Sequence, residues 1–107
     1  KEAVENIDAI LAVDGVDGVF IGPYDMSGSY GVPGQTSHAL VKAGCAQVLA
    51  ACKRADKAAG LHVVIPTPDA IGKAIDDGFT FIALGVDTVF LTQAAKDALS
   101  VTGQIQR

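Results

Sequence analysis

The sequence GVFIGPYDMSGSYG, residues 18–31, decides how the rest of the chain is interpreted. After Gly18, its opening residues are apolar and either β-branched or aromatic, a composition typical of a buried parallel strand. Gly22 and Pro23 end that run, and Asp25 follows within three residues of Gly22. In α/β proteins the chemistry sits at the carboxyl ends of parallel strands. We therefore predict a strand that presents the Asp25 carboxylate at an open rim.

Helices and short apolar strands alternate on both sides of this stretch. Apolar residues at helical spacing predict a helix over residues 1–13. The strand over residues 18–22 is expected to lead into a loop over residues 23–36, which is rich in Gly and Ser. Ser37 is the expected N-cap of the next helix, which Gly60 is expected to end. The remaining elements are expected as a strand over 61–65, a helix over 70–77 with Thr67 as N-cap and Pro68 at its first position, a strand over 79–84, a helix from Phe90 onward, and a frayed end over 104–107.

Strands that are apolar throughout and alternate with helices predict an α/β fold with a parallel sheet covered by helices. Three parallel strands cannot close a barrel, which normally takes eight. Residues 1–107 therefore correspond to about three-eighths of a (β/α)₈ barrel, as one portion with three strand–helix units after a first helix. On its own, such a sheet leaves two edges unpaired and one apolar face uncovered.

Composition narrows the class of protein. The net charge of −4 and the sequence pI of about 4.8 argue against binding to nucleic acid or to an anionic membrane surface. Cys45 and Cys52 lie seven residues apart, about 10.5 Å along a helix, which is too far for a disulfide and indicates two small buried thiols. The first six residues lack an apolar signal core, so we expect a soluble, cytoplasmic protein without a membrane span.

The chain resembles the C-terminal part of the HpcH/HpaI aldolase family, the metal-dependent class II pyruvate aldolases of the phosphoenolpyruvate/pyruvate barrel superfamily. The resemblance runs over essentially the whole chain, and its most specific part is the Gly-Pro-x-Asp-x-Ser segment that contains Asp25. Met26 stands where Leu is commoner in the family, and Tyr24 where Ala often sits. The residues that carry the resemblance are 3–8, 15–25, 27–29 and 85–88, with Gly31 and Gly34.

The resemblance implies a (β/α)₈ barrel whose last helix is exchanged between paired subunits, and hence a homo-oligomer. It implies a carbon–carbon lyase that reversibly cleaves a 2-keto-4-hydroxy acid to pyruvate and an aldehyde. A divalent metal, Mg²⁺, Mn²⁺ or Co²⁺, chelates the keto acid in that family. The matching positions make Asp25 a metal ligand. They place the pyruvate carboxylate on the backbone N–H groups of Tyr24 and Asp25, beside Gly22, where a side chain would block the ligand.

Part of the family's site has no counterpart in this sequence. Its second metal carboxylate is a Glu at the end of the preceding strand, which would fall before Lys1. Its carboxylate-binding Arg and its acid/base His also belong to earlier strands, and neither His38 nor His62 matches that His. The resemblance thus gives this chain one metal ligand and part of the substrate site, with no catalytic acid or base.

Other interpretations stay open at this stage. Asp25 could be a loop acid that caps a turn, while Ser27 and Ser29 could orient a substrate or satisfy loop amides. His62, inside a strand, fits a half-buried, hydrogen-bonded side chain. The chain could be a truncated, non-catalytic α/β module that self-associates, because its sheet is not closed. It could also be a relative of the citryl or malyl thioester lyases, which share the barrel and the use of a metal.

Overall fold

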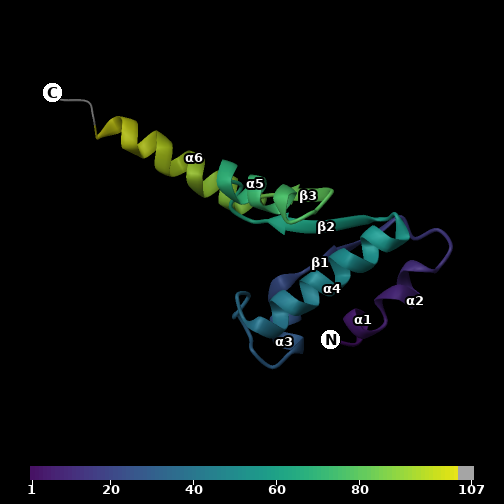
Figure 1. Cartoon of the computed structure of the whole chain (residues 1–107). Helices are drawn as coiled ribbons and strands as arrows, with labels where there is room; N and C mark the ends of the chain where they lie inside the picture. The colour runs from purple at the N-terminus through teal and green to yellow at the C-terminus, as the bar shows by residue number, and fades with distance from the viewer. Residues whose placement is uncertain (104–107) are drawn as a thin grey trace.

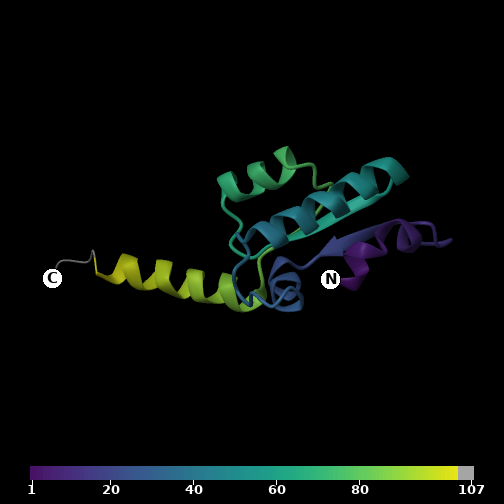
Figure 2. The same ribbon diagram turned by 60° about the horizontal axis from the view of Figure 1, so that its bottom comes forward.

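The computed structural model describes residues 1–103 and contains three parallel β–α units preceded by two short helices (Figures 1 and 2). Each strand is short and each is followed by at least one helix, as the alternation in the sequence predicts. The elements are α1 (Glu2–Glu5), α2 (Ile7–Leu11), β1 (Gly18–Ile21), α3 (Pro23–Ser29), α4 (Ala39–Ala55), β2 (Ala58–Val63), α5 (Pro68–Asp76), β3 (Phe81–Leu84) and α6 (Asp87–Thr102).

The three strands form one parallel sheet in the order β1-β2-β3. Ile21 of β1 is in register with Leu61 of β2, and Val63 of β2 with Leu84 of β3. All three strands therefore end at the same edge of the sheet. The segments that follow them, which begin at Gly22, Val64 and Gly85, form a common rim there. Asp25 belongs to this rim, as the sequence predicts.

One face of the sheet packs against α1, α2 and α4, and α5 adds to the same core. Leu11, Ala51 and Cys52 are almost completely buried there. Polar contacts hold α1 and α2 onto α4: the Gln47 amide donates to the Val4 carbonyl at 2.9 Å, and Arg54 pairs with Asp8 at 2.8 Å. The buried cluster consists of Val4, Ile7, Leu11, Ile21, Val48, Ala51, Cys52, Ala59, Val63, Ala74 and Phe79.

The opposite face of the sheet is open. Phe20 and Phe81 meet edge to face across Gly60, with ring centroids 5.4 Å apart, and they remain 48% and 56% exposed. A Cβ on Gly60 would lie 2.4 Å from the Phe20 ring, so the absence of a side chain at Gly60 lets the two rings meet. Side chains of this size lie inside a barrel when a parallel sheet closes. The expected uncovered apolar face is present.

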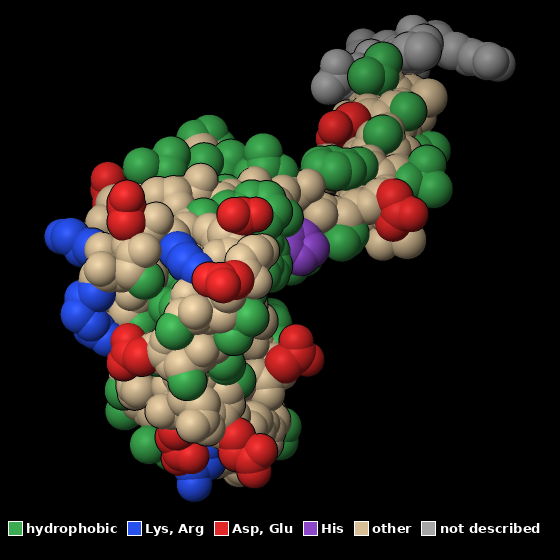
Figure 3. Space-filling view, turned by 90° about the vertical axis from the view of Figure 1, so that its right-hand side faces the viewer, with side chains coloured by type: hydrophobic (Ala, Val, Ile, Leu, Met, Phe, Trp, Pro, Cys, Tyr) green, Lys and Arg blue, Asp and Glu red, His purple; other side chains and the backbone are tan. Residues whose placement is uncertain are grey.

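Helix α6 projects from the sheet and gives the molecule extents of 65 × 29 × 22 Å (Figures 1 and 3). None of the residues described in α6 is buried, and Leu91 and Leu99 are among its exposed apolar side chains. Within residues 1–103, no helix has the length and apolar character required to cross a bilayer.

The expected loop over residues 23–36 is wrong in its first half, because residues 23–29 form α3. Gly22 is the extended N-cap of this helix, Pro23 takes its first position, and the acidic Asp25 lies in its first turn. Each of these features favours a helix start. The Gly and Ser residues between 27 and 31 outweighed these signals in the sequence interpretation.

Several other boundaries differ from expectation. Strand β2 begins at Ala58 rather than residue 61, β3 at Phe81 rather than residue 79, and α6 at Asp87 rather than Phe90. The first helix is two helices, because Asn6 leaves the helical conformation with ψ 17°. His38, rather than Ser37, caps α4 by accepting from the Leu40 amide through Nδ1. Asp56 ends α4 with a left-handed φ of 53°, so Gly60 lies within β2. The frayed end expected over residues 104–107 lies outside the described residues.

Candidate functional site

The Asp25 carboxylate is exposed at the rim and lies over the backbone of Gly22. A Cβ placed on Gly22 would stand 2.6 Å from Oδ2 of Asp25. The φ of Gly22 is −105°, which any residue can adopt, so the missing side chain makes room for the carboxylate rather than relieving the backbone. The turn from β1 into α3 thus presents one accessible anionic group beside an unobstructed stretch of backbone.

Two backbone N–H groups beside Asp25 are available to a ligand. The first intrahelical bond of α3 runs from the Met26 amide to the Gly22 carbonyl at 2.8 Å. Pro23 has no N–H, and the N–H groups of Tyr24 and Asp25 have no backbone acceptor among the described residues. Such groups normally bind water, a cap or an anion.

Substituting Gly22 by Ala tests how closely the carboxylate depends on that space. We expect Gly22→Ala to displace the Asp25 carboxylate while leaving the melting temperature within a few degrees of the parent, because the backbone angles suit Ala. The measurement is the ¹³Cγ chemical shift of Asp25 and the amide shifts of Tyr24 and Asp25 in both proteins, together with the thermal melt. Unchanged shifts in Gly22→Ala would show that the carboxylate does not rest against Gly22.

Ser27 holds the first turn of α3 in place. It is the only polar side chain that is buried in residues 1–103. Its hydroxyl donates to the Tyr24 carbonyl at 2.6 Å and accepts from the Gly34 amide at 2.9 Å. The sequence left two roles open for Ser27, to orient a substrate or to satisfy loop amides. The structure shows that its hydroxyl hydrogen-bonds to backbone groups on either side. It ties the segment after α3 back onto the turn that carries Asp25.

A groove runs along the side of β1 that has no neighbouring strand among the described residues. Its volume is about 450 Å³, and apolar side chains of α1, α2 and β1 line most of it. Gly22 and Asp25 lie at one end, together with Ser29. The groove therefore joins the accessible carboxylate to an open, apolar strand edge.

The other candidate side chains lie elsewhere. The Tyr24 side chain is 68% exposed and borders a different cavity, together with Cys45 and Lys73. Thr67 is the N-cap of α5, as expected, and accepts from the Ala70 amide at 3.2 Å. His62 is half-buried and hydrogen-bonded to the Gly85 carbonyl, as expected.

The two cysteines are free thiols on α4, as their spacing predicts. Burial raises the pKa of the Cys45 and Cys52 thiols above the usual value, and hydrogen bonding to the backbone opposes this only in part. A raised pKa keeps both thiols protonated near neutral pH, which makes them poor nucleophiles.

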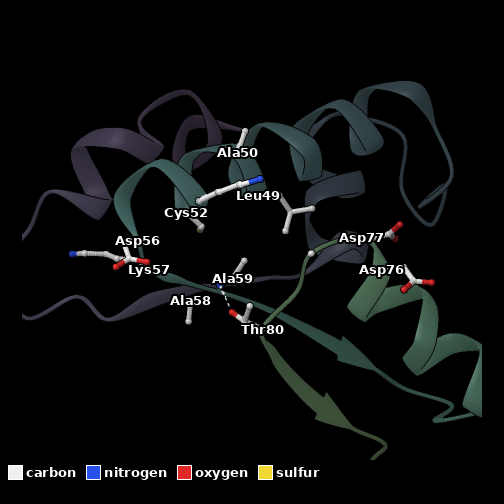
Figure 4. Close-up of a pocket in the computed structure, with 12 residues that line it drawn as sticks. Leu49, Ala50, Cys52, Asp56, Lys57, Ala58, Ala59, Asp76, Asp77 and Thr80 are labelled. Atoms are coloured by element: carbon white, nitrogen blue, oxygen red, sulfur yellow. Dashed lines mark hydrogen bonds between the residues drawn. The ribbon is translucent and has the colours of Figure 1, made fainter.

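A cavity of about 720 Å³ lies at the opposite end of the sheet, where β2 and β3 begin (Figure 4). Its charged lining is mixed, with Asp76 and Asp77 at the end of α5 and Lys53 on α4. Lys57 also lines it but donates to the Leu11 carbonyl at 2.5 Å, while Asp77 pairs with Lys73 at 2.8 Å. These groups are engaged structurally and lie away from the rim.

The donor set at Asp25 fits a partial site for a hard divalent cation. Mg²⁺ is commonly bound by one or two protein carboxylates, with water and substrate oxygens completing its shell. Within residues 1–103, no group of three or more His, Cys, Asp or Glu side chains is placed to hold a metal ion. Asp25 can therefore supply one carboxylate to such an ion.

Comparison with known proteins identifies the family of this chain. The family model described as HpcH/HpaI aldolase/citrate lyase matches residues 1–94. The chain belongs to the HpcH/HpaI aldolase/citrate lyase family. The resemblance that the Gly-Pro-x-Asp-x-Ser segment indicated is confirmed over most of the chain.

Curated relatives and solved structures are also similar to this chain. A 2-keto-3-deoxy-L-rhamnonate aldolase of Salmonella dublin is 42% identical over 99% of this chain, and one of Klebsiella pneumoniae is 44% identical over 94%. An HpcH/HpaI aldolase of Desulfitobacterium hafniense superposes with a TM-score of 0.80 at 30% identity over 98% of this chain. The citrate synthase SbnG superposes with a TM-score of 0.77 at 26% identity over 96% of this chain.

The chain spans about two-fifths of the length of these relatives: 39% of the Salmonella protein, 37% of the Klebsiella protein, and 40% and 41% of the two solved structures. The expected partial (β/α)₈ barrel is thereby confirmed. Three of its parallel strands, with their helices, lie within this chain.

Proposed function

We propose that residues 1–107 are the C-terminal portion of a metal-dependent aldolase barrel that cleaves 2-keto-4-hydroxy acids to pyruvate and an aldehyde. The observation that carries the proposal is the Asp25 carboxylate, exposed over Gly22 at the carboxyl end of a parallel strand. The names of the Salmonella and Klebsiella relatives support a 2-keto-3-deoxy sugar acid as the substrate class.

The groove along β1 supports a barrel completed by further strands. A strand added in parallel to this edge would occupy the apolar groove and would end beside Asp25. The end of that strand is where the family resemblance places a second metal carboxylate. The open face around Phe20 and Phe81 would then become the inside of the barrel.

The rim residues of this chain would have distinct roles in binding the metal and the keto acid. The Asp25 carboxylate would hold a divalent cation, which when bound supplies Lewis-acid polarisation of a keto oxygen. The N–H groups of Tyr24 and Asp25 would donate to the keto acid carboxylate, which can approach because Gly22 has no side chain. Ser27 would keep these two N–H groups in place. No residue of this chain is assigned as the acid or base.

A chimera tests the proposal directly. Residues 1–107 would replace the matching segment of the Salmonella aldolase, to which they are 42% identical. We expect the chimera to release pyruvate from 2-keto-3-deoxy-L-rhamnonate, to lose this activity with a chelator, and to regain it with Mn²⁺. The isolated chain should release none, because it carries one of two metal carboxylates. A folded chimera without activity, or one indifferent to the chelator, would contradict the proposal.

The relation to citryl and malyl thioester lyases remains a less favoured alternative. The similarity to the citrate synthase SbnG is lower in sequence, at 26% identity, than that to the rhamnonate aldolases. No separate feature for a coenzyme A group is present in the sequence.

A cytoplasmic location also remains a prediction from the sequence.

Self-association is the second part of the proposal, and it holds whether or not the chain is catalytic. Helix α6 has an apolar stripe that no other described element covers, and the sheet has an open face. We infer that a second copy of the chain covers α6, in line with the exchanged last helix that the resemblance implies. The apolar stripe comprises Leu91, Ala94, Ala95, Ala98 and Val101.

A matched pair of variants tests the role of this stripe. Leu91→Glu introduces a charge on the stripe, whereas Gln93→Glu introduces the same residue on the polar side of α6. We expect light scattering to show an oligomer for the parent and for Gln93→Glu, and at least about a tenfold weaker association for Leu91→Glu. A folded, monomeric parent chain would contradict self-association, and equal behaviour of the two variants would exclude the stripe.

A further inference from the structure

The uncovered face of the sheet carries a histidine at its rim end. Side chains alternate between the two faces of β2, so His62 shares a face with Gly60, over which the Phe20 and Phe81 rings meet. His62 is in register with Ala83 of β3 and lies one residue beyond the level of Ile21. It therefore stands on the middle strand, between the rim segment of Asp25 and that of β3.

The His62 ring reaches the rim segment of β3. Its Nε2 lies 2.6 Å from the Gly85 carbonyl oxygen. A carbonyl oxygen can only accept a hydrogen bond, so Nε2 carries the proton in this contact. The Gly85 amide donates in turn to the Val63 carbonyl at 2.8 Å. Both polar groups of the Gly85 backbone are thus held by β2.

Gly85 is also the point at which α6 joins the sheet. Its φ is +63°, in the left-handed region that favours glycine. The Phe90 ring packs against its Cα, where a Cβ would lie 2.2 Å from the ring. Phe90 itself lies in the first turn of α6, and the Phe90 amide donates to the Val86 carbonyl at 3.0 Å.

We propose that His62 is a positioning residue that fixes the Gly85–Val86 rim segment and the direction in which α6 leaves the sheet. None of the described residues of α6 is buried against the sheet or its helices, so the junction sets this direction. Within residues 1–103, the bond from His62 is the only hydrogen bond between a side chain and the Gly85 backbone. The proposal does not depend on which ligand Asp25 binds.

Three variants separate positioning from general stability. His62→Leu keeps an apolar side chain and removes the donor, and His62→Gln restores a donor on a flexible amide. His38→Leu removes the other histidine, which caps α4 and is not bonded to Gly85. Each would be compared with the parent by amide hydrogen exchange at single residues. Residual dipolar couplings would report the direction of α6 relative to α4.

In His62→Leu we expect amide exchange at Gly85, Val89 and Phe90 to rise about tenfold, as the loss of one hydrogen bond allows, with α4 unchanged. The residual dipolar couplings of α6 should shrink toward averaged values. His62→Gln should reverse part of both changes, and His38→Leu should show neither change. In the parent, the ¹⁵N shifts of His62 should show a protonated Nε2. Unchanged exchange and couplings in His62→Leu, or a neutral ring with its proton on Nδ1, would overturn the proposal.

Discussion

Replacing Asp25 by Asn should lower pyruvate release by the chimeric aldolase at least about a hundredfold. The substitution keeps the size of the side chain and removes the anionic oxygen that a hard cation requires. Stabilisation of transition-state charge by a metal is worth several kcal/mol, and about 1.4 kcal/mol corresponds to a factor of ten in rate. The readouts are the initial rate of pyruvate release and the affinity for Mn²⁺ by calorimetry, both of which should fall.

The chain offers a close control for this substitution. Asp69 also lies in the first turn of a helix that begins with a proline, and it follows β2 at the same edge of the sheet as Asp25. Asp69→Asn should leave the rate and the Mn²⁺ affinity near those of the parent. Both variants should lose at most about 1 kcal/mol of stability, the value of an acid at a helix start. Equal rates for the Asp25 and Asp69 variants would remove Asp25 from the mechanism.

Replacing Ser27 by Ala should destabilise the folded chain by about 1–3 kcal/mol, the cost of leaving buried hydrogen-bonding groups without partners. The substitution removes the donor to the Tyr24 carbonyl and the acceptor of the Gly34 amide at a side chain with 0% exposure. Urea denaturation followed by circular dichroism would measure the loss. All variants should be compared at one protein concentration, because association adds to the apparent stability.

Ser100 provides the matched comparison. Its hydroxyl donates to the Asp97 carbonyl three residues earlier, at 2.7 Å, just as Ser27 donates to the Tyr24 carbonyl, but Ser100 is exposed on α6. Ser100→Ala should therefore cost less than about 0.5 kcal/mol. If the two substitutions cost the same, Ser27 is not the structural tie proposed for the turn that carries Asp25.

The sequence predicted the strands and the position of Asp25 because their signals are local. Apolar β-branched runs and the alternation of strands with helices need no knowledge of distant contacts. The same is true of Thr67 and Pro68, whose capping pattern predicted the start of α5 correctly. The placement of Asp25 at the rim follows from the direction of β1 alone.

The features that the sequence did not predict depend on contacts between distant segments. Gly60 ended a helix in the sequence interpretation, because nothing local reveals that the Phe20 and Phe81 rings meet above it. The closure of Ser27 onto the Gly34 amide depends on how the chain turns back after α3. One signal was available and underweighted: Pro23 followed two residues later by an acid is a helix start, and it predicts α3.

The isolation of α6 has a consequence for how this part of the chain folds. A helix of 16 residues with none of its described side chains buried is only marginally stable in water, since each helix must first form a costly nucleus. The proposed packing of the apolar stripe against a second copy would therefore be linked to the helix–coil equilibrium of α6. Dilution should unwind α6 while the sheet and α4 stay folded, so its helical content should rise with protein concentration.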